Sequence, residues 1–360
     1  QFYNKMLGKY SVNSSGKGPG MGRRNKSYSK DLHQQAYDRL TGMQAFGESK
    51  KAAVAAGTDK DKIFSFNTYQ TYWKHTKYFI KYIREHHPEC TTLKSARKYA
   101  NEWLQARVDQ GLSAWTVQVE AKALGKLYGI QPDDEAYFKP PKRNRGEIKR
   151  SRGDRVRDQH FSKTNNDELI KFCQGTGLRR SELEALKGKD LVTKAQIEAE
   201  ITRLEAVPED KLTAQEEKRL GVLKDTRMFP GEYFTFVRNG KGGRERISPI
   251  IGKNAEQIVA RMQDTPEEEK VWQHVHKCAD IHAYRAEYAT AIYKAHARDI
   301  KDIPYDRVNR GTGRRYQSQV YVCRKDEAGK KLDKAAMLVC SKALGHNRIS
   351  VVADNYIRGL

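Results

Sequence analysis

The chain carries four short segments whose residue types suit chemistry at a phosphodiester. In order, they are TGLRRSEL at 176–183, the turn sequence NGKGGRER at 239–246, HAYRAEYAT at 282–290 and LGHNRISVVADNYI at 344–357. A phosphodiester under attack gains negative charge on its non-bridging oxygens. Guanidinium groups can hold that charge through paired N–H bonds and do not lose their protons. The segments therefore predict a site for phosphoryl transfer.

The residues of these segments divide into complementary roles. Arg179 and Arg285 are the candidates for the paired guanidiniums. His282 lies three residues before Arg285, so both should share one face of a helix. His282 and His346 can donate hydrogen bonds to the same oxygens or move a proton. Lys241 lies at a glycine-flanked hairpin tip, where its ammonium group could protonate a leaving 5′ oxygen.

Tyr356, at the end of the last segment, is the candidate nucleophile. A phenol with a pKa of about 10 is mostly protonated at neutral pH. Surrounding cations and a nearby histidine would favour its anionic form. Attack would give a 3′-phosphotyrosyl link and a free 5′ hydroxyl, which stores the bond energy without ATP. The segments hold no carboxylate cluster of the kind that binds two metal ions, so we expect chemistry without metal or cofactor.

In this order the four segments resemble the catalytic boxes of the tyrosine recombinases, the phage-integrase family. The resemblance covers about residue 161 to the end, and the preceding helical unit is similar, less specifically, to the family's core-binding domain. It implies that Glu182 orients the site rather than reacting. Many members have a histidine directly after the second arginine, where this chain has Ala286.

The resemblance also implies a biological setting. It predicts site-specific integration or excision of a mobile element by an enzyme that binds double-stranded DNA as a homotetramer on two sites. An accessory DNA-bending or directionality factor is a possible further partner. The expected location is the bacterial cytosol, in association with the nucleoid and not with a membrane.

Composition agrees with a nucleic-acid partner. The chain has 68 Lys and Arg residues against 45 Asp and Glu, a formal net charge of +23, which favours a polyanionic partner. Five cysteines, an odd number without a CxxC pair, predict reduced thiols in a cytosolic protein. No segment has the apolar length of a membrane span.

The predicted fold class is mainly α with small β-sheet elements. We expect a flexible basic arm at 1–30, a helical core-binding domain at 31–135, a basic linker at 136–160 and an α+β catalytic domain at 161–360. Residues 194–225 predict a helical hairpin insertion within it, either solvated or in contact with a partner. The resemblance implies that the two domains form a C-shaped clamp around DNA.

Apolar periodicity and helix breakers locate the elements that must position the site. The sequence predicts helices at 31–46, from Thr68 to the His-His-Pro at 86–88, and at 94–110, 113–128, 165–174 and 281–297, with one more after Gly177 and one leading into LGHN. Residues 50–62 predict a loop. The NGKGG turn predicts a β-hairpin over 232–250, and a further extended pair is expected from residues 315–324 and 329–338.

Several residue assignments have alternatives in the sequence. Arg180 could replace Arg179, and Arg244 or Arg246 could replace Lys241. Tyr356 could be a packed aromatic residue, as other tyrosines of the same region could be (Tyr288, Tyr293, Tyr321). A run of His and Cys side chains invites a zinc site, but HxHxC is not a familiar closed set (His274, His276, Cys278, His282).

Three other functions are compatible with parts of the sequence. A type IB topoisomerase or a telomere resolvase would use the same chemistry but reseal the strand differently. A DNA-binding protein that lost catalysis would keep the fold, although no candidate catalytic position is missing here. A basic protein that binds RNA or a membrane surface is the third alternative, and no RNA-recognition motif supports it.

Overall fold

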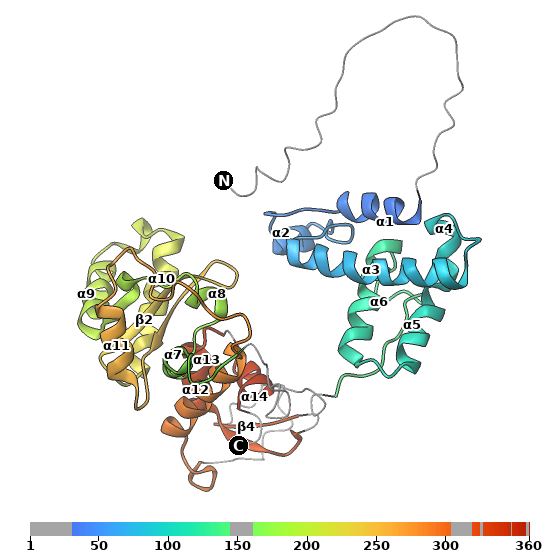
Figure 1. Cartoon of the computed structure of the whole chain (residues 1–360). Coiled ribbons are helices and arrows are strands. Elements are labelled where there is room, and N and C mark those ends of the chain that lie inside the picture. Colours follow the sequence, from blue (N-terminus) through green and yellow to red (C-terminus); the bar gives the residue numbers. More distant parts are fainter. Residues whose placement is uncertain (1–30, 145–160, 304–318, 325–326, 347, 358–359) are drawn as a thin grey trace, which may run out of the picture. The chain divides into compact units, whose positions relative to one another are not determined.

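The computed structural model describes residues 31–144, 161–303, 319–324, 327–346, 348–357 and 360. They fall into two compact units, an N-terminal unit that ends at Asn144 and a C-terminal unit after it (Figure 1). Helices predominate, and the strands form two small antiparallel sheets. The predicted class, mainly α with small β elements, is confirmed. The predicted arm at 1–30 lies outside the described residues.

Within the described residues, the regular elements of the N-terminal unit are all helices. Its helices are α1 (Leu32–Thr41), α2 (Lys50–Ala55), α3 (Phe66–His86), α4 (Leu93–Ala96), α5 (Ala100–Asp109) and α6 (Ala114–Tyr128). The side chains of Ser65 and Ser113 cap α3 and α6 by accepting backbone N–H groups of the first turn. The loop predicted at 50–62 is partly wrong, because Ser49 caps a short alanine-containing helix there.

The core of this unit forms around α3, whose apolar stripe packs against α1, α5 and α6. Phe79, Ile80 and Ile83 are almost fully buried in it. Tyr137 and Phe138, the first aromatic residues of the predicted linker, pack against the same core. The described start of that linker is therefore part of the N-terminal unit, and residues 145–160 lie outside the described residues.

The C-terminal unit contains the four segments. Its α-helices and strands are α7 (Asp167–Thr176), α8 (Arg180–Leu183), β1 (Leu191–Thr193), α9 (Lys194–Glu205), α10 (Ala214–Asp225), β2 (Tyr233–Gly240), β3 (Arg244–Pro249), α11 (Ala255–Gln263), α12 (Ile281–His296), β4 (Val320–Val322), β5 (Lys331–Asp333), α13 (Lys334–Ala343) and α14 (Ser350–Asn355). The first sheet has the antiparallel order β1-β2-β3, and β4 pairs with β5. The predicted β-hairpin, extended pair and α12 are confirmed. The helix expected after Gly177 is only the four-residue α8, and β1 and α11 were not expected.

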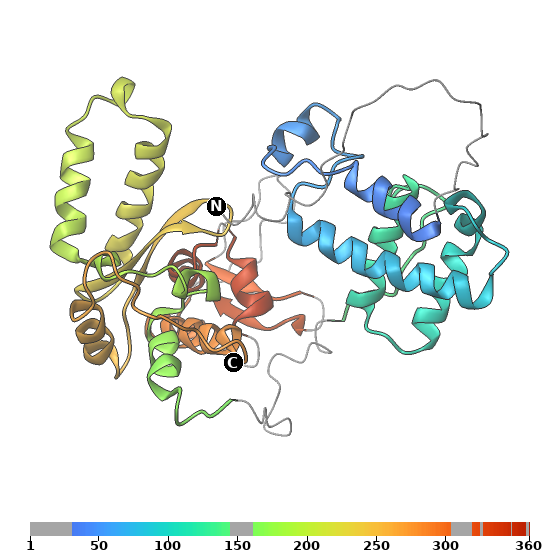
Figure 2. The same ribbon diagram turned by 45° about the horizontal axis from the view of Figure 1, so that its top comes forward.

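The predicted helical hairpin at 194–225 is confirmed as α9 and α10, which connect β1 to β2. Figure 2 shows the two helices projecting together from the sheet. They are attached through apolar side chains, since Ile197, Ile201 and Leu204 of α9 and Leu223 of α10 are buried in the core of the unit. The position of the α9–α10 hairpin beside the β2–β3 hairpin is therefore fixed by packing.

Helix α12 joins the two apolar cores of the C-terminal unit. Ile281 and Tyr284 pack into one core, and Tyr288 and Ile292 pack into the other. Arg285 lies between these pairs, so the fold places a guanidinium where two apolar clusters meet. In the described parts of the chain, no helix is both long and apolar enough to cross a membrane.

Candidate active site

A cavity of about 950 Å³ in the C-terminal unit collects side chains from all four segments. Six of the seven predicted site residues line it (Arg179, Lys241, His282, Arg285, His346, Tyr356). The seventh, Glu182, lies behind Arg179, with which it forms an ion pair of 2.6 Å. The fold thus brings together residues that are up to 177 positions apart, as Arg179 and Tyr356 are.

Arg285 is the most enclosed of the cavity's cations, with 2% of its surface exposed. Its guanidinium donates to the carbonyl oxygens of Gly177 and Leu344, and its Nε donates to the hydroxyl of Tyr356 at 3.3 Å. Burial, with the nearby charge of Arg246, lowers the pKa of Arg285 to about 10, so it stays protonated at neutral pH. It can therefore hold both the tyrosine and an anionic ligand.

The conformation and packing of Gly177 explain why the first segment has a glycine after Thr176. It ends α7 in the left-handed region, at φ +59°. A Cβ at this position would overlap the ring of Tyr288. Glycine therefore allows both the turn and the close packing that present its carbonyl oxygen to Arg285.

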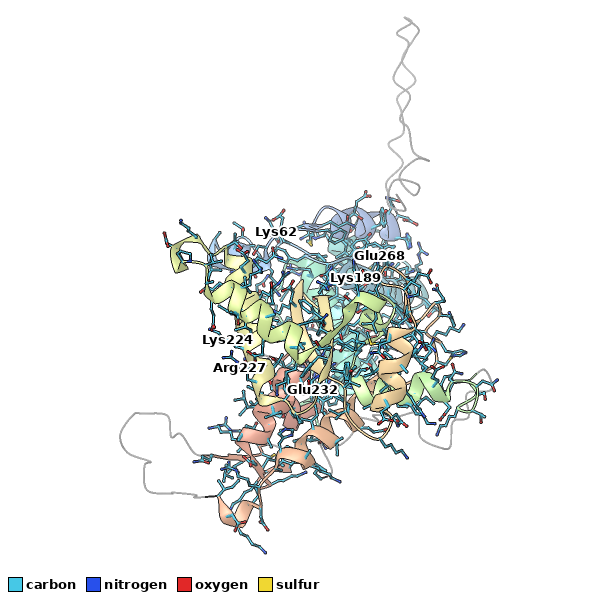
Figure 3. The ribbon with its side chains drawn as sticks, turned by 90° about the vertical axis from the view of Figure 1, so that its left-hand side faces the viewer. Lys62, Lys189, Lys224, Arg227, Glu232 and Glu268 are labelled. Carbon is cyan, nitrogen blue, oxygen red and sulfur yellow. The ribbon has the colours of Figure 1, made fainter. Side chains whose placement is uncertain are left out.

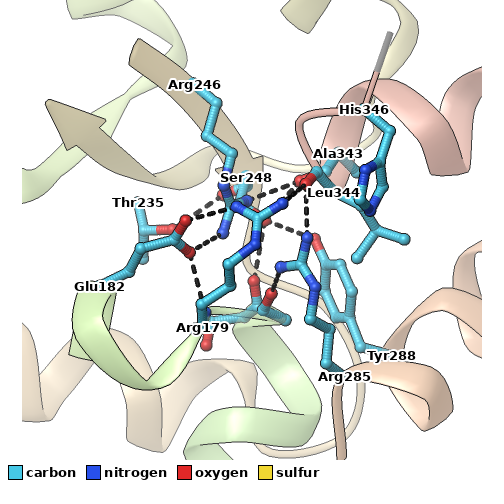
Figure 4. A network of polar contacts seen from close by, with 12 residues as sticks. Arg179, Glu182, Thr235, Arg246, Ser248, Arg285, Tyr288, Ala343, Leu344 and His346 are labelled. Atoms are coloured by element: carbon cyan, nitrogen blue, oxygen red, sulfur yellow. Dashed lines mark hydrogen bonds and ion pairs between the residues drawn. The ribbon is translucent and has the colours of Figure 1, made fainter. Parts of the chain in front are cut away.

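Glu182 is the acceptor at the centre of a buried network of arginines (Figure 4). Its carboxylate accepts from Nη1 of Arg179 at 2.6 Å, from the backbone N–H of Arg179 at 2.8 Å and from Nη2 of Arg246 at 2.5 Å. Burial alone would raise the pKa of Glu182, but the charges and hydrogen bonds of Arg246 and Arg179 hold it at about 2. An ionised acceptor of this kind can orient Arg179, as the orienting role requires.

Arg246 is a residue of this site that the sequence suggested only as a substitute for Lys241. It is 4% exposed, and its Nη1 donates to the carbonyl oxygen of Ala343 at 2.7 Å. Its aliphatic stem fills the space beside Gly345, where a Cβ would collide with it. Arg246 therefore ties β3 to both Glu182 and the LGH turn. The only signal in the sequence that could have identified Arg246 is its position, one residue before the apolar end of a strand.

Replacing Arg246 by Ala is expected to lower the free energy of unfolding by about 3 to 5 kcal/mol, because the carboxylate of Glu182 would stay buried with one partner removed. Urea denaturation of the full chain measures this. Arg227→Ala is the matched control (Arg227 is labelled in Figure 3). Arg227 pairs with Glu198 at 2.9 Å on the surface, so the change should cost less than about 1 kcal/mol. Equal losses from the two variants would contradict the buried-network role.

Tyr356 lies directly after α14 and presents its hydroxyl to the cavity. The hydroxyl is 3.3 Å from Nε2 of His346, and its ring lies parallel to that of His282, with centroids 5.4 Å apart. Two other tyrosines that the sequence offered as alternatives form hydrogen bonds to the backbone. Tyr288 donates its hydroxyl proton to the carbonyl oxygen of Pro249, and the hydroxyl of Tyr293 accepts the backbone N–H of Asp333. Their hydroxyls are bonded to backbone groups, whereas the hydroxyl of Tyr356 faces a cavity.

His346 is held in its neutral form at neutral pH. Burial, followed by the charges of Arg285 and Arg179, lowers its pKa to about 4. A neutral imidazole can accept a proton, and Nε2 lies beside the hydroxyl of Tyr356. The geometry and charge therefore suit His346 to take the proton of Tyr356. His282 stacks on the ring of Tyr356 instead and is exposed to the cavity.

The pKa of His346 predicts a loss of stability in acid. Because the pKa is about 4 in the folded chain and 6.5 without the fold, the unfolded chain binds more protons between these values. Lowering the pH through this window should therefore cost about 3 kcal/mol. Urea denaturation from about pH 7 to about pH 4 should show a smaller loss for His346→Gln than for the wild type. An identical loss in both would refute the assignment.

The remaining alternative site residues differ in how deeply they are buried and in their hydrogen-bond partners. Arg180 donates to the carbonyl oxygens of Val275, His276, Lys277 and Ala279, so its guanidinium anchors the loop before α12. Lys241 and Arg244 are exposed at the hairpin, whereas Arg246 is enclosed. Within the described residues, no group of three or more His, Cys, Asp or Glu side chains could hold a metal ion, and this includes the His and Cys run at 274–282.

Comparison with known proteins assigns no family. No protein-family model matches the chain, and no curated protein is significantly similar to it.

Proposed function

We propose that the chain is a site-specific DNA recombinase of the tyrosine class, which cuts and rejoins DNA through a 3′-phosphotyrosyl intermediate. The observation that carries the proposal is the position of the Tyr356 hydroxyl, between neutral His346 and buried Arg285 at the wall of a cationic cavity. A phenol in this setting has both a proton acceptor and an anion-binding partner. Both are needed by an oxygen nucleophile that attacks a phosphodiester.

In the proposed cleavage step, Oη of Tyr356 forms a bond to phosphorus while the bond from phosphorus to the 5′ oxygen breaks. The phenolic proton passes to Nε2 of His346, 3.3 Å away. Arg179 and Arg285 stabilise the negative charge that grows on the non-bridging oxygens. Glu182 keeps Arg179 in place, and His282 can donate a further hydrogen bond from the cavity wall.

The departing 5′ oxygen requires a proton, and Lys241 is the proposed donor. Its ammonium group is exposed at the β2–β3 turn, where it lines the same cavity as Tyr356. The products are a 3′-phosphotyrosyl link and a 5′ hydroxyl. Because one phosphodiester replaces another, a 5′ hydroxyl of the same or a second duplex can reverse the reaction without ATP or a cofactor.

The proposed substrate is double-stranded DNA of a mobile element. The net charge of +23 supports a polyanionic ligand, and Lys74, Lys77 and Lys81 are exposed along α3 of the N-terminal unit. In this proposal the two units clamp one duplex in a C shape, with the basic linker along its phosphates. Four protomers on two sites would exchange the strands in the bacterial cytosol, with an accessory factor setting direction.

A nicked suicide duplex that carries the element's end sequence tests the proposal. Its short strand dissociates after cleavage, so the covalent intermediate accumulates. We expect a protein–DNA adduct on a denaturing gel in the presence of EDTA, and exchange between two duplexes with intact substrates. Tight binding without an adduct would favour a silent DNA-binding protein, and plasmid relaxation without exchange would favour a type IB topoisomerase.

A further inference from the structure

A second hollow, of about 1100 Å³, lies between α10, the β2–β3 hairpin and α13. It is continuous with the candidate active site, because six residues line both (Arg179, Lys241, Gly242, Arg244, Gly345, His346). We call it the α10 groove. One of its walls belongs to the insertion at 194–225.

Helix α10 turns a defined face toward this groove. Ala214, Gln215, Lys218, Arg219, Val222 and Asp225 line it, at a spacing that follows one side of a helix. Arg219 forms two hydrogen bonds to the carboxylate of Glu245 on β3, at 2.9 and 2.6 Å. Leu223 is buried in the core on another side of the helix. The helix is therefore held on the hairpin in a fixed orientation.

The groove is strongly basic. Its lining contains eight Lys and Arg side chains against two carboxylates, those of Asp225 and Glu245. Both carboxylates are paired inside the groove, Asp225 with Lys342 at 2.7 Å and Glu245 with Arg219. Among the described residues, Lys218 has no ion pair and is exposed, so its charge is available to a ligand.

We propose that the α10 groove binds the phosphate backbone of the DNA duplex beside the phosphate at which cleavage occurs. The insertion then belongs to the DNA-binding surface and is not a solvated appendage. This inference rests on the proposed function, because it takes the ligand of the adjoining cavity to be DNA. A strand that has one phosphate between Arg179 and Arg285 continues past the hairpin tip, and the groove offers cations along that path.

The salt dependence of DNA binding tests the inference. Binding of the nicked suicide duplex is measured in the Tyr356→Phe background, where it stays reversible, for Lys218→Ala and for the control Lys224→Ala. Lys224, labelled in Figure 3, is on the same helix. It pairs with Glu205 at 2.8 Å and does not line the groove. Each lost phosphate contact lowers the slope of log affinity against log salt by about 0.9, so affinity should fall about 3.5-fold less between 50 and 200 mM salt.

We expect this change for Lys218→Ala and an unchanged slope for Lys224→Ala. With Tyr356 present and DNA saturating, the control Lys224→Ala should form the adduct at the wild-type rate, since Lys224 lies outside the groove. Equal slopes for the two variants would overturn the inference while the adduct still supports the proposed function. A wild-type protein that neither binds the duplex nor forms an adduct would overturn both.

Discussion

Replacing Tyr356 by Phe is expected to abolish the covalent protein–DNA adduct, a loss of at least about 10⁴-fold in cleavage rate. The change removes only the hydroxyl that faces His346 and Arg285, and it leaves the ring that stacks on His282. The fold and the DNA affinity should therefore be kept. The adduct is quantified on a denaturing gel, and binding is measured by gel shift with the same nicked duplex.

Tyr293→Phe is the matched control for this prediction. Tyr293 is in the same unit, but its hydroxyl accepts the backbone N–H of Asp333. The variant should lose about 1 kcal/mol of stability and still form the adduct. An adduct of equal yield from Tyr356→Phe would assign the nucleophile to another residue, which peptide mapping of the DNA-linked fragment would then identify.

Replacing Arg285 by Ala is expected to lower the cleavage rate by at least about 10² to 10³-fold. Its guanidinium binds the hydroxyl of Tyr356 and is the enclosed partner for charge on a bound phosphate. Arg285→Lys should recover little, because an ammonium cannot reproduce the fork that reaches Gly177, Leu344 and Tyr356 together. Single-turnover adduct formation at saturating duplex measures the step directly.

Arg180→Ala is the control that distinguishes an effect on catalysis from an effect on folding in this experiment. Arg180 also donates to backbone carbonyl oxygens, but among the described residues it has no hydrogen bond to Tyr356. Both variants should be less stable than the wild type in urea. Per folded molecule, Arg180→Ala should cleave much faster than Arg285→Ala. A similar rate for the two would mean that Arg285 acts through the fold alone.

Local sequence determined the elements that depend on neighbouring residues. Ser113 caps α6 at the start that the sequence predicted, Ser65 caps α3 so that the helix begins two residues before the predicted Thr68, and the NGKGG turn joins β2 to β3. These features are predictable because caps, turns and apolar periodicity act within a few residues of each other. The segment order also predicted which side chains would line one cavity, and six of the seven do.

Some local elements were decided by packing. The short helix α8 ends after Leu183, where the sequence suggested a longer one, and the three-residue β1 exists because it pairs with β2. The loop prediction at 50–62 missed α2, whose six residues give too short a pattern to recognise. Short elements gain most of their stability from tertiary contacts, so their sequences carry a weak signal.

The tertiary structure alone decided how the polar groups of the site are paired. Arg246 and Glu182 are 64 positions apart, and no local pattern predicts their ion pair of 2.5 Å. The tertiary structure also distinguished Tyr356 from Tyr288. The hydroxyl of Tyr288 donates to a backbone carbonyl oxygen and that of Tyr356 lies beside His346, because a hydroxyl's partner depends on which groups the fold places next to it. Sequence determined the chemical groups available to this protein. The fold determined which of them are buried together, because burial and charge pairing arise from contacts between distant segments.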